Sequence, residues 1–175
     1  MKMLKLLSIF ILSLCTILVV TQSRNILPNN VDLIQQTCKK TPNYALCIEY
    51  LNADPKAPTA DVNGLAQIMV NVMKTKANDG LNKIHQLIAG GPPGQQAALK
   101  SCAEEYNTIV VYNVPNAISA LQKGDPKFAE EAANDAANEA NDCERGFSGN
   151  SPLTTENNVM HDASVITSAI VKILL

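Results

Sequence analysis

The stretch DVNGLAQIMVNVMKTKANDGLNKIHQLIAGG, residues 61–91, decides the fold class of this 175-residue chain. Asp61 is a residue type that caps helix N-termini, and the apolar residues after it recur at spacings of three and four, the period of an amphipathic helix. The Gly- and Pro-rich run 90–94 ends the pattern. We therefore predict one long helix. Its apolar positions are Leu65, Ile68, Met69, Val72, Ala77, Leu81, Ile84, Leu87 and Ile88.

Three further stretches show the same helical period. The second ends at Gly124, and Pro115 within it removes a backbone donor, which predicts a kink. The third runs from Pro126 to about Phe147 and carries alanines on its inward face, so that neighbouring helices can approach it closely. The fourth follows the turn 149–152. Four helices joined by short turns, with no alternating strand pattern, predict an all-α fold that forms an antiparallel four-helix bundle.

Two shorter amphipathic segments precede the bundle. The turn Thr41-Pro42-Asn43 separates them, and a polar linker with Pro55 and Pro58 follows them. We therefore predict an N-terminal helical hairpin at 24–54 and a four-helix bundle at 55–175, which together form one domain.

Residues 1–23 have the pattern of a secretory signal peptide. Lys2 and Lys5 precede an apolar run of 15 residues from Leu6 to Val20, and small polar residues follow at the expected cleavage point near Ser23. The alternative is a membrane anchor, but the run is shorter than the roughly 20 residues that span a bilayer. We predict cleavage and secretion, and no membrane association afterwards.

Charge and length narrow the classes of partner. The chain after residue 23 has about 150 residues, which suits a single domain with its own core. Without Lys2 and Lys5, 12 basic residues face 16 acidic ones. That acidic balance argues against nucleic acid and against an anionic membrane surface as partner.

The cysteines indicate disulfides. Cys15 lies in the predicted signal peptide, and the four that remain are an even number in a secreted chain. Of three possible connectivities, the local pairing of Cys38 with Cys47 is the most economical, and it leaves Cys102 to pair with Cys143. A zinc site is disfavoured because the spacings are not C-x-x-C units. We predict no metal and no cofactor.

Catalytic motifs are missing from the sequence. The acidic pairs Glu104-Glu105 and Glu130-Glu131 resemble the carboxylates of a glycosidase only superficially, because adjacent residues on a helix point about 100° apart. We expect these pairs on solvated faces. No nucleophile and base are placed together, so we predict that the chain is not an enzyme.

The segment Gly124-Asp125-Pro126-Lys127-Phe128 is the strongest candidate for a binding element. It has the composition of an ordinary helix start, with Asp125 as the N-cap and Pro126 at the first helical position. It also presents Lys127 and Phe128 from a corner that loses little entropy on binding, which suits a competitive protein inhibitor. Both interpretations are compatible with these five residues.

Three motifs resemble the plant invertase inhibitor and pectin methylesterase inhibitor family. They are TCKKTPNY at 37–44 followed by Cys47, LAQIMV at 65–70, and AISALQKGDPKFAE at 117–130. The last resembles the invertase-inhibitor branch in particular. The resemblance implies a four-helix bundle with an N-terminal hairpin, disulfides Cys38–Cys47 and Cys102–Cys143, and no catalytic activity.

The resemblance also implies a target and contact residues. In the invertase branch the Pro-Lys-Phe element enters the sucrose site of the enzyme, which corresponds here to Pro126, Lys127 and Phe128, supported by Gly124 and Asp125. We therefore expect a secreted inhibitor of an acid invertase, in the apoplast rather than the vacuole. The alternatives are an inhibitor of pectin methylesterase, which would use a helical face of the bundle, and a secreted helical interaction protein without an enzyme target.

Overall fold

The computed structural model describes residues 30–91 and 93–175, and the predicted signal peptide lies outside these ranges. Within them the chain is helical and has no strand, as the sequence predicts. The α-helices are α2 (Asn30–Cys38), α3 (Tyr44–Asn52), α4 (Val62–Gly90), α5 (Gln96–Thr108), α6 (Val114–Lys123), α7 (Pro126–Arg145) and α8 (Thr154–Val171). Short 3-10 turns are η1 (Ala57–Thr59), η2 (Pro93–Gln95) and η4 (Lys172–Leu174), and η3 (Ile109–Asn113) is a π-helical turn.

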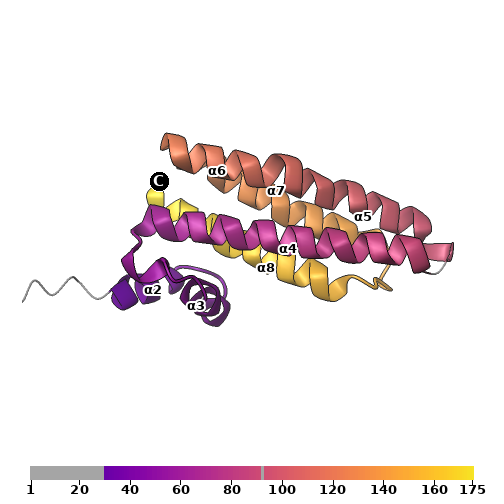
Figure 1. The fold of residues 1–175 in the computed structure, drawn as a ribbon, viewed down its shortest axis with the longest axis horizontal. Helices are drawn as coiled ribbons and strands as arrows, with labels where there is room; N and C mark the ends of the chain where they lie inside the picture. The colour runs from indigo at the N-terminus through magenta and orange to yellow at the C-terminus, as the bar shows by residue number, and fades with distance from the viewer. Residues whose placement is uncertain (1–29, 92) are drawn as a thin grey trace, which may run out of the picture.

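The helices form an antiparallel four-helix bundle. One long rod is α4, the second is α5, η3 and α6 end to end, the third is α7 and the fourth is α8 (Figure 1). The α2–α3 hairpin lies beside the end of the bundle where α6 ends and where the C-terminus lies (Figure 1). Consequently the corner between α6 and α7 is at this same end, far from the loop between α4 and α5.

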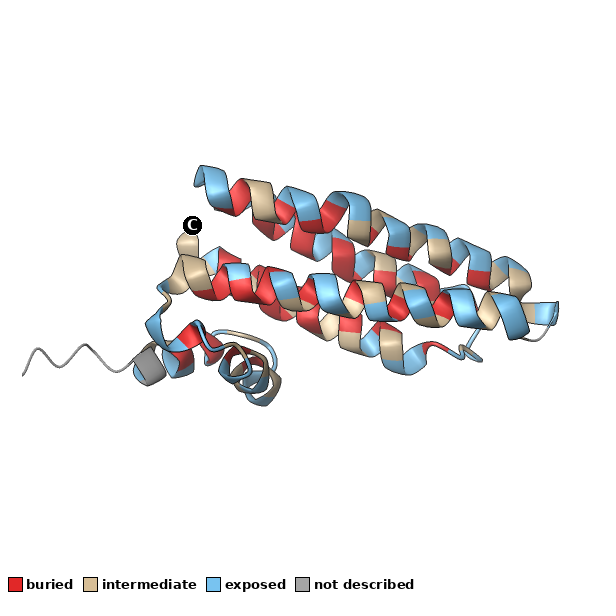
Figure 2. Ribbon diagram, in the orientation of Figure 1, coloured by how far each residue is buried: buried red, intermediate tan, exposed pale blue. Residues whose placement is uncertain are grey.

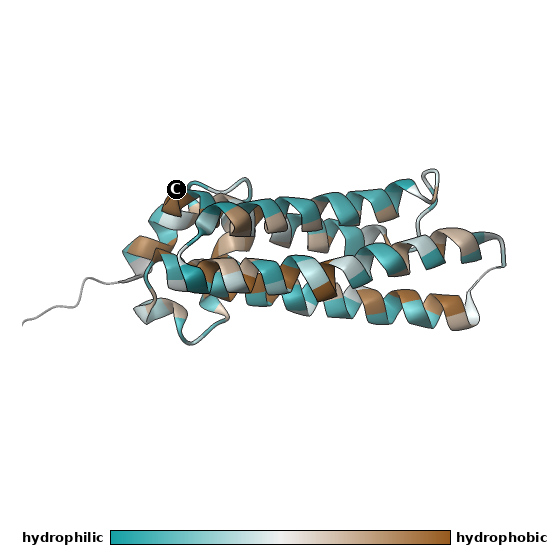
Figure 3. Cartoon of the chain, turned by 90° about the horizontal axis from the view of Figure 1, so that it is seen from above, coloured by the Kyte–Doolittle hydropathy of each residue, from teal (hydrophilic) through white to brown (hydrophobic). Residues whose placement is uncertain are grey.

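Burial follows the helical period (Figure 2). In α4 the side chain of Asp61 accepts a hydrogen bond of 2.7 Å from the backbone N–H of Gly64, so the predicted N-cap is confirmed. Leu65, Met69 and Ile84 are fully buried, and the outward side of the rods is mostly hydrophilic (Figure 3). The core therefore lies along the bundle axis, where the four apolar stripes meet.

Small residues let α7 pack closely against its neighbours. Ala129, Ala133, Ala136 and Ala140 are all fully buried, which confirms the predicted small inward face. Methyl-sized side chains allow α8 on one side and α5–α6 on the other to approach α7 without leaving voids.

Two disulfides fasten the fold, with the pairing that the sequence favours. Cys38 bonds to Cys47 and closes the α2–α3 hairpin. Cys102 of α5 bonds to Cys143 of α7 and joins two rods of the bundle. All four cysteines are buried.

The second rod adapts to Pro115 through a wider turn. This is the π-helical turn η3, in which the N–H of Val114 bonds to the carbonyl of Ile109, five residues earlier. Pro115 then stands at the start of α6, where its missing N–H costs little. The rod therefore continues to Lys123, and the proline is accommodated by one wider turn.

A polar network, buried at Tyr106 and Asn157, ties three rods together near the Cys102–Cys143 disulfide. The hydroxyl of Tyr106 donates to Asn157 over 2.9 Å, and the amide of Asn157 donates to Glu144 over 2.6 Å. Thr154 donates to the other oxygen of Glu144, also over 2.6 Å. The Tyr106 ring lies against Gly80 of α4, so the cluster contacts all four rods.

None of the helices in the described ranges combines the length and the apolar character that a bilayer crossing requires.

Candidate functional site

The corner between α6 and α7 is built from backbone hydrogen bonds. Gly124 has φ 73° and ψ 29°, in the left-handed region that glycine adopts without strain. The N–H of Asp125 bonds to the carbonyl of Ala120 over 2.9 Å, and the N–H of Gly124 points to Leu121 over 3.4 Å. This pair of bonds is a Schellman motif, which closes α6 and aims the chain into α7.

The predicted capping role of Asp125 is wrong. Asp125 occupies the N-cap position of α7, but its side chain makes no capping hydrogen bond. With φ −115° and ψ 72°, its backbone departs from the extended geometry usual at capping residues. The corner is held instead by the glycine motif that ends α6 and by Pro126, the first residue of α7.

Lys127 and Phe128 are both exposed. The Lys127 side chain is 58% accessible and Phe128 is 61% accessible, whereas Pro126 is half-buried. Phe128 is one of the few large apolar residues in the described ranges that solvent reaches to this extent. The two exposed side chains are therefore available to a partner.

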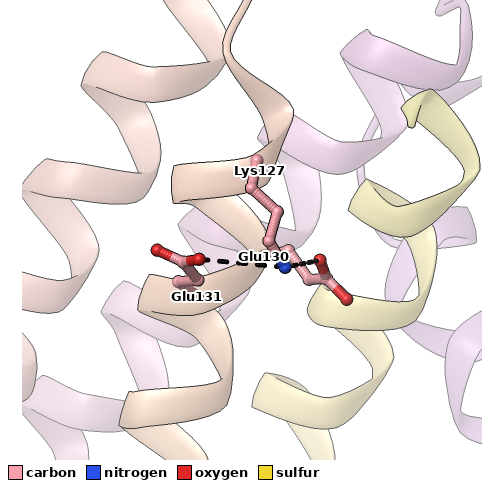
Figure 4. Close-up of polar contacts among 3 residues, drawn as sticks. All are labelled: Lys127, Glu130 and Glu131. Carbon is pink, nitrogen blue, oxygen red and sulfur yellow. Dashed lines mark hydrogen bonds and ion pairs between the residues drawn. The ribbon is translucent and has the colours of Figure 1, made fainter.

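Lys127 is not an isolated cation. Its ammonium donates to Glu130 over 2.9 Å and lies 3.8 Å from a carboxylate oxygen of Glu131. Figure 4 shows the ammonium between the two carboxylates. The hydrogen bond to Glu130, more than any other contact, raises the pKa of Lys127. An ammonium has three donors, so Lys127 can keep Glu130 and still bond to a carboxylate of a partner.

The expectation that both acidic pairs lie on solvated faces is wrong for Glu130. Glu130 is only 8% accessible, and its charge is compensated by Lys127. Adjacent acidic residues in α7 therefore have different surroundings, with Glu131 more than half exposed on the next face of the helix.

A groove of about 760 Å³ runs from the corner along the boundary between η3–α6 and α7. The exposed rings of Tyr112 and Phe128 line it from opposite rods. Glu131, Asp135 and Glu139 line it at successive turns of α7. The sequence interpretation missed this groove, although its signal was present: the three carboxylates repeat every four residues, a like-charge spacing that destabilises a helix.

Burial and neighbouring carboxyl groups alter the protonation of Glu139. Partial burial in the groove, followed by the hydrogen-bonded carboxyl of Glu105 from α5 and the charge of Asp135, raises the pKa of Glu139 to about 7. Glu139 is therefore about half protonated at neutral pH, and the groove gains negative charge as the pH rises above 7.

No metal centre can be assembled from the described residues, where no group of three or more His, Cys, Asp and Glu side chains is suitably placed. Asp135, Glu139 and Glu105 form an electronegative surface rather than a coordination site.

A family model described as "Plant invertase/pectin methylesterase inhibitor" matches residues 32–172. The chain belongs to this family. The match includes both disulfides, the corner and the groove, so the whole described fold is the inhibitor fold rather than an enzyme with an inhibitor-like segment.

The relatives within the inhibitor family are named as inhibitors of two different enzymes. The chain is 43% identical over 138 residues to "Cell wall / vacuolar inhibitor of fructosidase 1" of Arabidopsis thaliana, across 79% of this chain and 67% of that protein. It is 27% identical over 134 residues to "Pectinesterase inhibitor" of Actinidia deliciosa, across 76% of this chain and 70% of that protein.

A solved structure of an inhibitor-family member confirms the architecture. The mutant form A of a pectin methylesterase inhibitor from Arabidopsis superposes with a TM-score of 0.69 at 24% identity, over 79% of this chain and 94% of that one. At this identity the likeness establishes the bundle and hairpin, while the target has to be argued from residues.

Proposed function

We propose that the chain is a secreted inhibitor of a plant acid invertase, which it blocks by inserting the corner Pro126-Lys127-Phe128 into the active-site cleft. The observation that carries the proposal is the exposure of Lys127 and Phe128 on a corner whose backbone is held by the Gly124 motif. A preorganised element of this kind loses little conformational entropy on binding.

The chemistry of the corner suits a glycosidase cleft. Such clefts contain a pair of carboxyl groups, and Lys127 can donate charge-assisted hydrogen bonds to them while the Phe128 ring fills apolar space. The first turn of α7 adds to this, since no side chain caps it and helix N-termini favour anions. The corner therefore offers an ammonium, a ring and a positive helix end within three residues.

Sequence similarity favours the same target. Over alignments of similar length, identity is 43% to a protein named as an inhibitor of fructosidase and 27% to one named as a pectinesterase inhibitor. The first name also includes both cell wall and vacuole. We propose the apoplast as the site of action, because residues 1–23 have the pattern of a secretory leader.

Inhibition of pectin methylesterase is the second candidate. It is favoured by the exposed groove along α6 and α7, because the family resemblance implies that the pectin methylesterase branch uses a helical face of the bundle. In that case the corner would lie at the edge of the interface, and Lys127 would contribute little.

Paired inhibition assays against an acid invertase and a pectin methylesterase distinguish the candidates. The informative variant is Lys127→Gln, which keeps an N–H donor for Glu130 and removes the charge; Lys100→Ala removes an exposed lysine from the opposite end of the bundle as the control. We expect Lys127→Gln to weaken invertase inhibition at least tenfold, with an unchanged melting temperature. Inhibition of the esterase alone, or equal inhibition by wild type and Lys127→Gln, would refute the proposal.

A further inference from the structure

The groove between η3–α6 and α7 has properties that the corner does not explain. Four of the five charged residues that line it are acidic: Asp125, Glu131, Asp135 and Glu139, against Lys123. Within the described ranges, no basic side chain forms an ion pair with Asp125, Asp135 or Glu139. Asp125 and Asp135 therefore have no basic partner in these ranges, whereas Glu131 is paired with Lys127 and Glu139 is hydrogen-bonded to the carboxyl of Glu105.

Two exposed aromatic side chains lie along the same groove. Tyr112 is 64% accessible and Phe128 is 61% accessible, and both rings line the groove. Large exposed rings beside a hollow mark interaction sites more often than chance surface positions do. Together with the carboxylates they provide what a guanidinium or ammonium group prefers, a ring face for cation–π contact and oxygens for charge-assisted hydrogen bonds.

The π-helical turn explains how Tyr112 reaches this position. Turns of this type are frequent at functional sites, and η3 presents Tyr112 to solvent while Asn113, its neighbour, is buried. When the Asn113 amide is oriented to satisfy both its ends, it donates to the carbonyl of Thr108 and accepts from the N–H of Ala136, each over 3.0 Å. The wider turn is thereby fastened to α7, and the wall of the groove is fixed before any partner arrives.

We propose that this groove receives an arginine- or lysine-bearing segment of the enzyme that the chain inhibits, an inference that rests on the proposed function. The cationic head bonds to Asp135 and Glu139 beside the Tyr112 ring, while Lys127 and Phe128, about two to three turns earlier in α7, enter the cleft. Charges of opposite sign then alternate across the interface, which fixes its register and accelerates encounter.

The groove is tested first without any enzyme. A capped Gly-Arg-Gly-Arg-Gly peptide and its citrulline counterpart, which has the same shape without the charge, are titrated into the isotopically labelled protein at low salt. The pH is kept above the raised pKa of Glu139, so that this carboxyl group is ionised. We expect the amide resonances of α6 and α7 around the groove to shift with the arginine peptide, and about tenfold weaker binding of the citrulline peptide. The double variant Asp135→Asn/Glu139→Gln weakens binding at least fivefold. Its control, Glu49→Gln/Asp79→Asn, removes two exposed acids elsewhere and leaves binding unchanged.

Several outcomes overturn the proposal. Equal affinity for the two peptides, unchanged binding by Asp135→Asn/Glu139→Gln, or no shift at the groove amides would each do so. Shifts caused by a neutral oligosaccharide but not by the arginine peptide would identify a sugar site instead.

Association with the inhibited enzyme separates this proposal from the previous one. Asp135→Asn/Glu139→Gln should slow association and reduce its dependence on salt, whereas Lys127→Gln should weaken inhibition and leave peptide binding intact. If Lys127→Gln inhibits normally, the corner proposal fails while the peptide titration still decides the groove. If the peptide binds but the enzyme associates with wild type and double variant at the same rate, the assignment of the groove to the enzyme is wrong.

Discussion

Gly80 is the position where one added carbon should disturb the bundle most. It is buried in the middle of α4, beside the ring of Tyr106 from the second rod. A Cβ atom there would lie 2.9 Å from both Cδ1 and Cζ of Tyr106, and would overlap Cε1 between them. Gly80→Ala therefore cannot be accommodated unless the ring or the helix moves.

Opposing effects set the size of the loss. Alanine in place of glycine favours a helix by about 1 kcal/mol. Overpacking a core costs about 1–3 kcal/mol. The ring is also held by its hydroxyl, which bonds to Asn157 over 2.9 Å, and loss of that buried bond adds about 1–3 kcal/mol. We expect Gly80→Ala to lower the free energy of unfolding by about 2–3 kcal/mol, or roughly 5–10 °C in melting temperature.

Urea unfolding followed by circular dichroism, with both disulfides intact, measures this change. Gly90→Ala is the matched control, because it lies in the same helix and a Cβ there meets no atom within 4 Å. Tyr106→Leu should relieve the clash, so that the double variant Gly80→Ala/Tyr106→Leu loses less than the sum of the single changes. If Gly80→Ala is as stable as Gly90→Ala, the ring does not lock the rods and the reasoning is wrong.

Three further changes test other parts of the structure. Gly124→Ala should lower the free energy of unfolding by about 1 kcal/mol, because its φ of 73° strains any side chain although the space is open; an unchanged denaturation midpoint would contradict this. Glu139 has its pKa raised to about 7, so the stability that its protonated form contributes is complete below pH 4.5 and is lost as the pH rises to 7. Glu139→Gln should remove about 1 kcal/mol of that decline, after allowance for solvent screening, in unfolding curves measured across this range. Replacing Cys102 and Cys143 by serine opens a loop with a sequence separation of 41 and should lower the free energy of unfolding by about 4 kcal/mol. The same change at Cys38 and Cys47, with a separation of 9, should lower it by about 3 kcal/mol. Equal losses in calorimetry would contradict the loop-entropy argument.

Local signals were sufficient for most of the fold. The helical period, the Asp61 cap, the glycine turns and the cysteine count each depend on residues close in sequence, and the structure confirms all four. The disulfide pairing also followed, because one of the three connectivities needs only a short loop.

Features that depend on contacts between rods were not predictable in the same way. The burial of Glu130 and the elevated pKa of Glu139 require knowledge of which residue of another turn or helix faces them. Asp125 shows that residue type alone does not establish a helix cap. It occupies the expected capping position, but the Schellman motif of the preceding helix sets its backbone, and its side chain makes no cap.

The π-helical turn at Ile109–Asn113 sets which face of α6 meets the core. Each residue rotates an α-helix by about 100°, so the extra residue of a wider turn changes the rotational phase of the helical residues that follow it in the same rod. α6 follows η3 without a break, and in the observed phase its buried residues are Val114, Ala117, Ala120 and Leu121. Deleting one residue from 109–113 would leave the composition of the rod almost unaltered, yet it would turn this apolar stripe by about 100° away from the core.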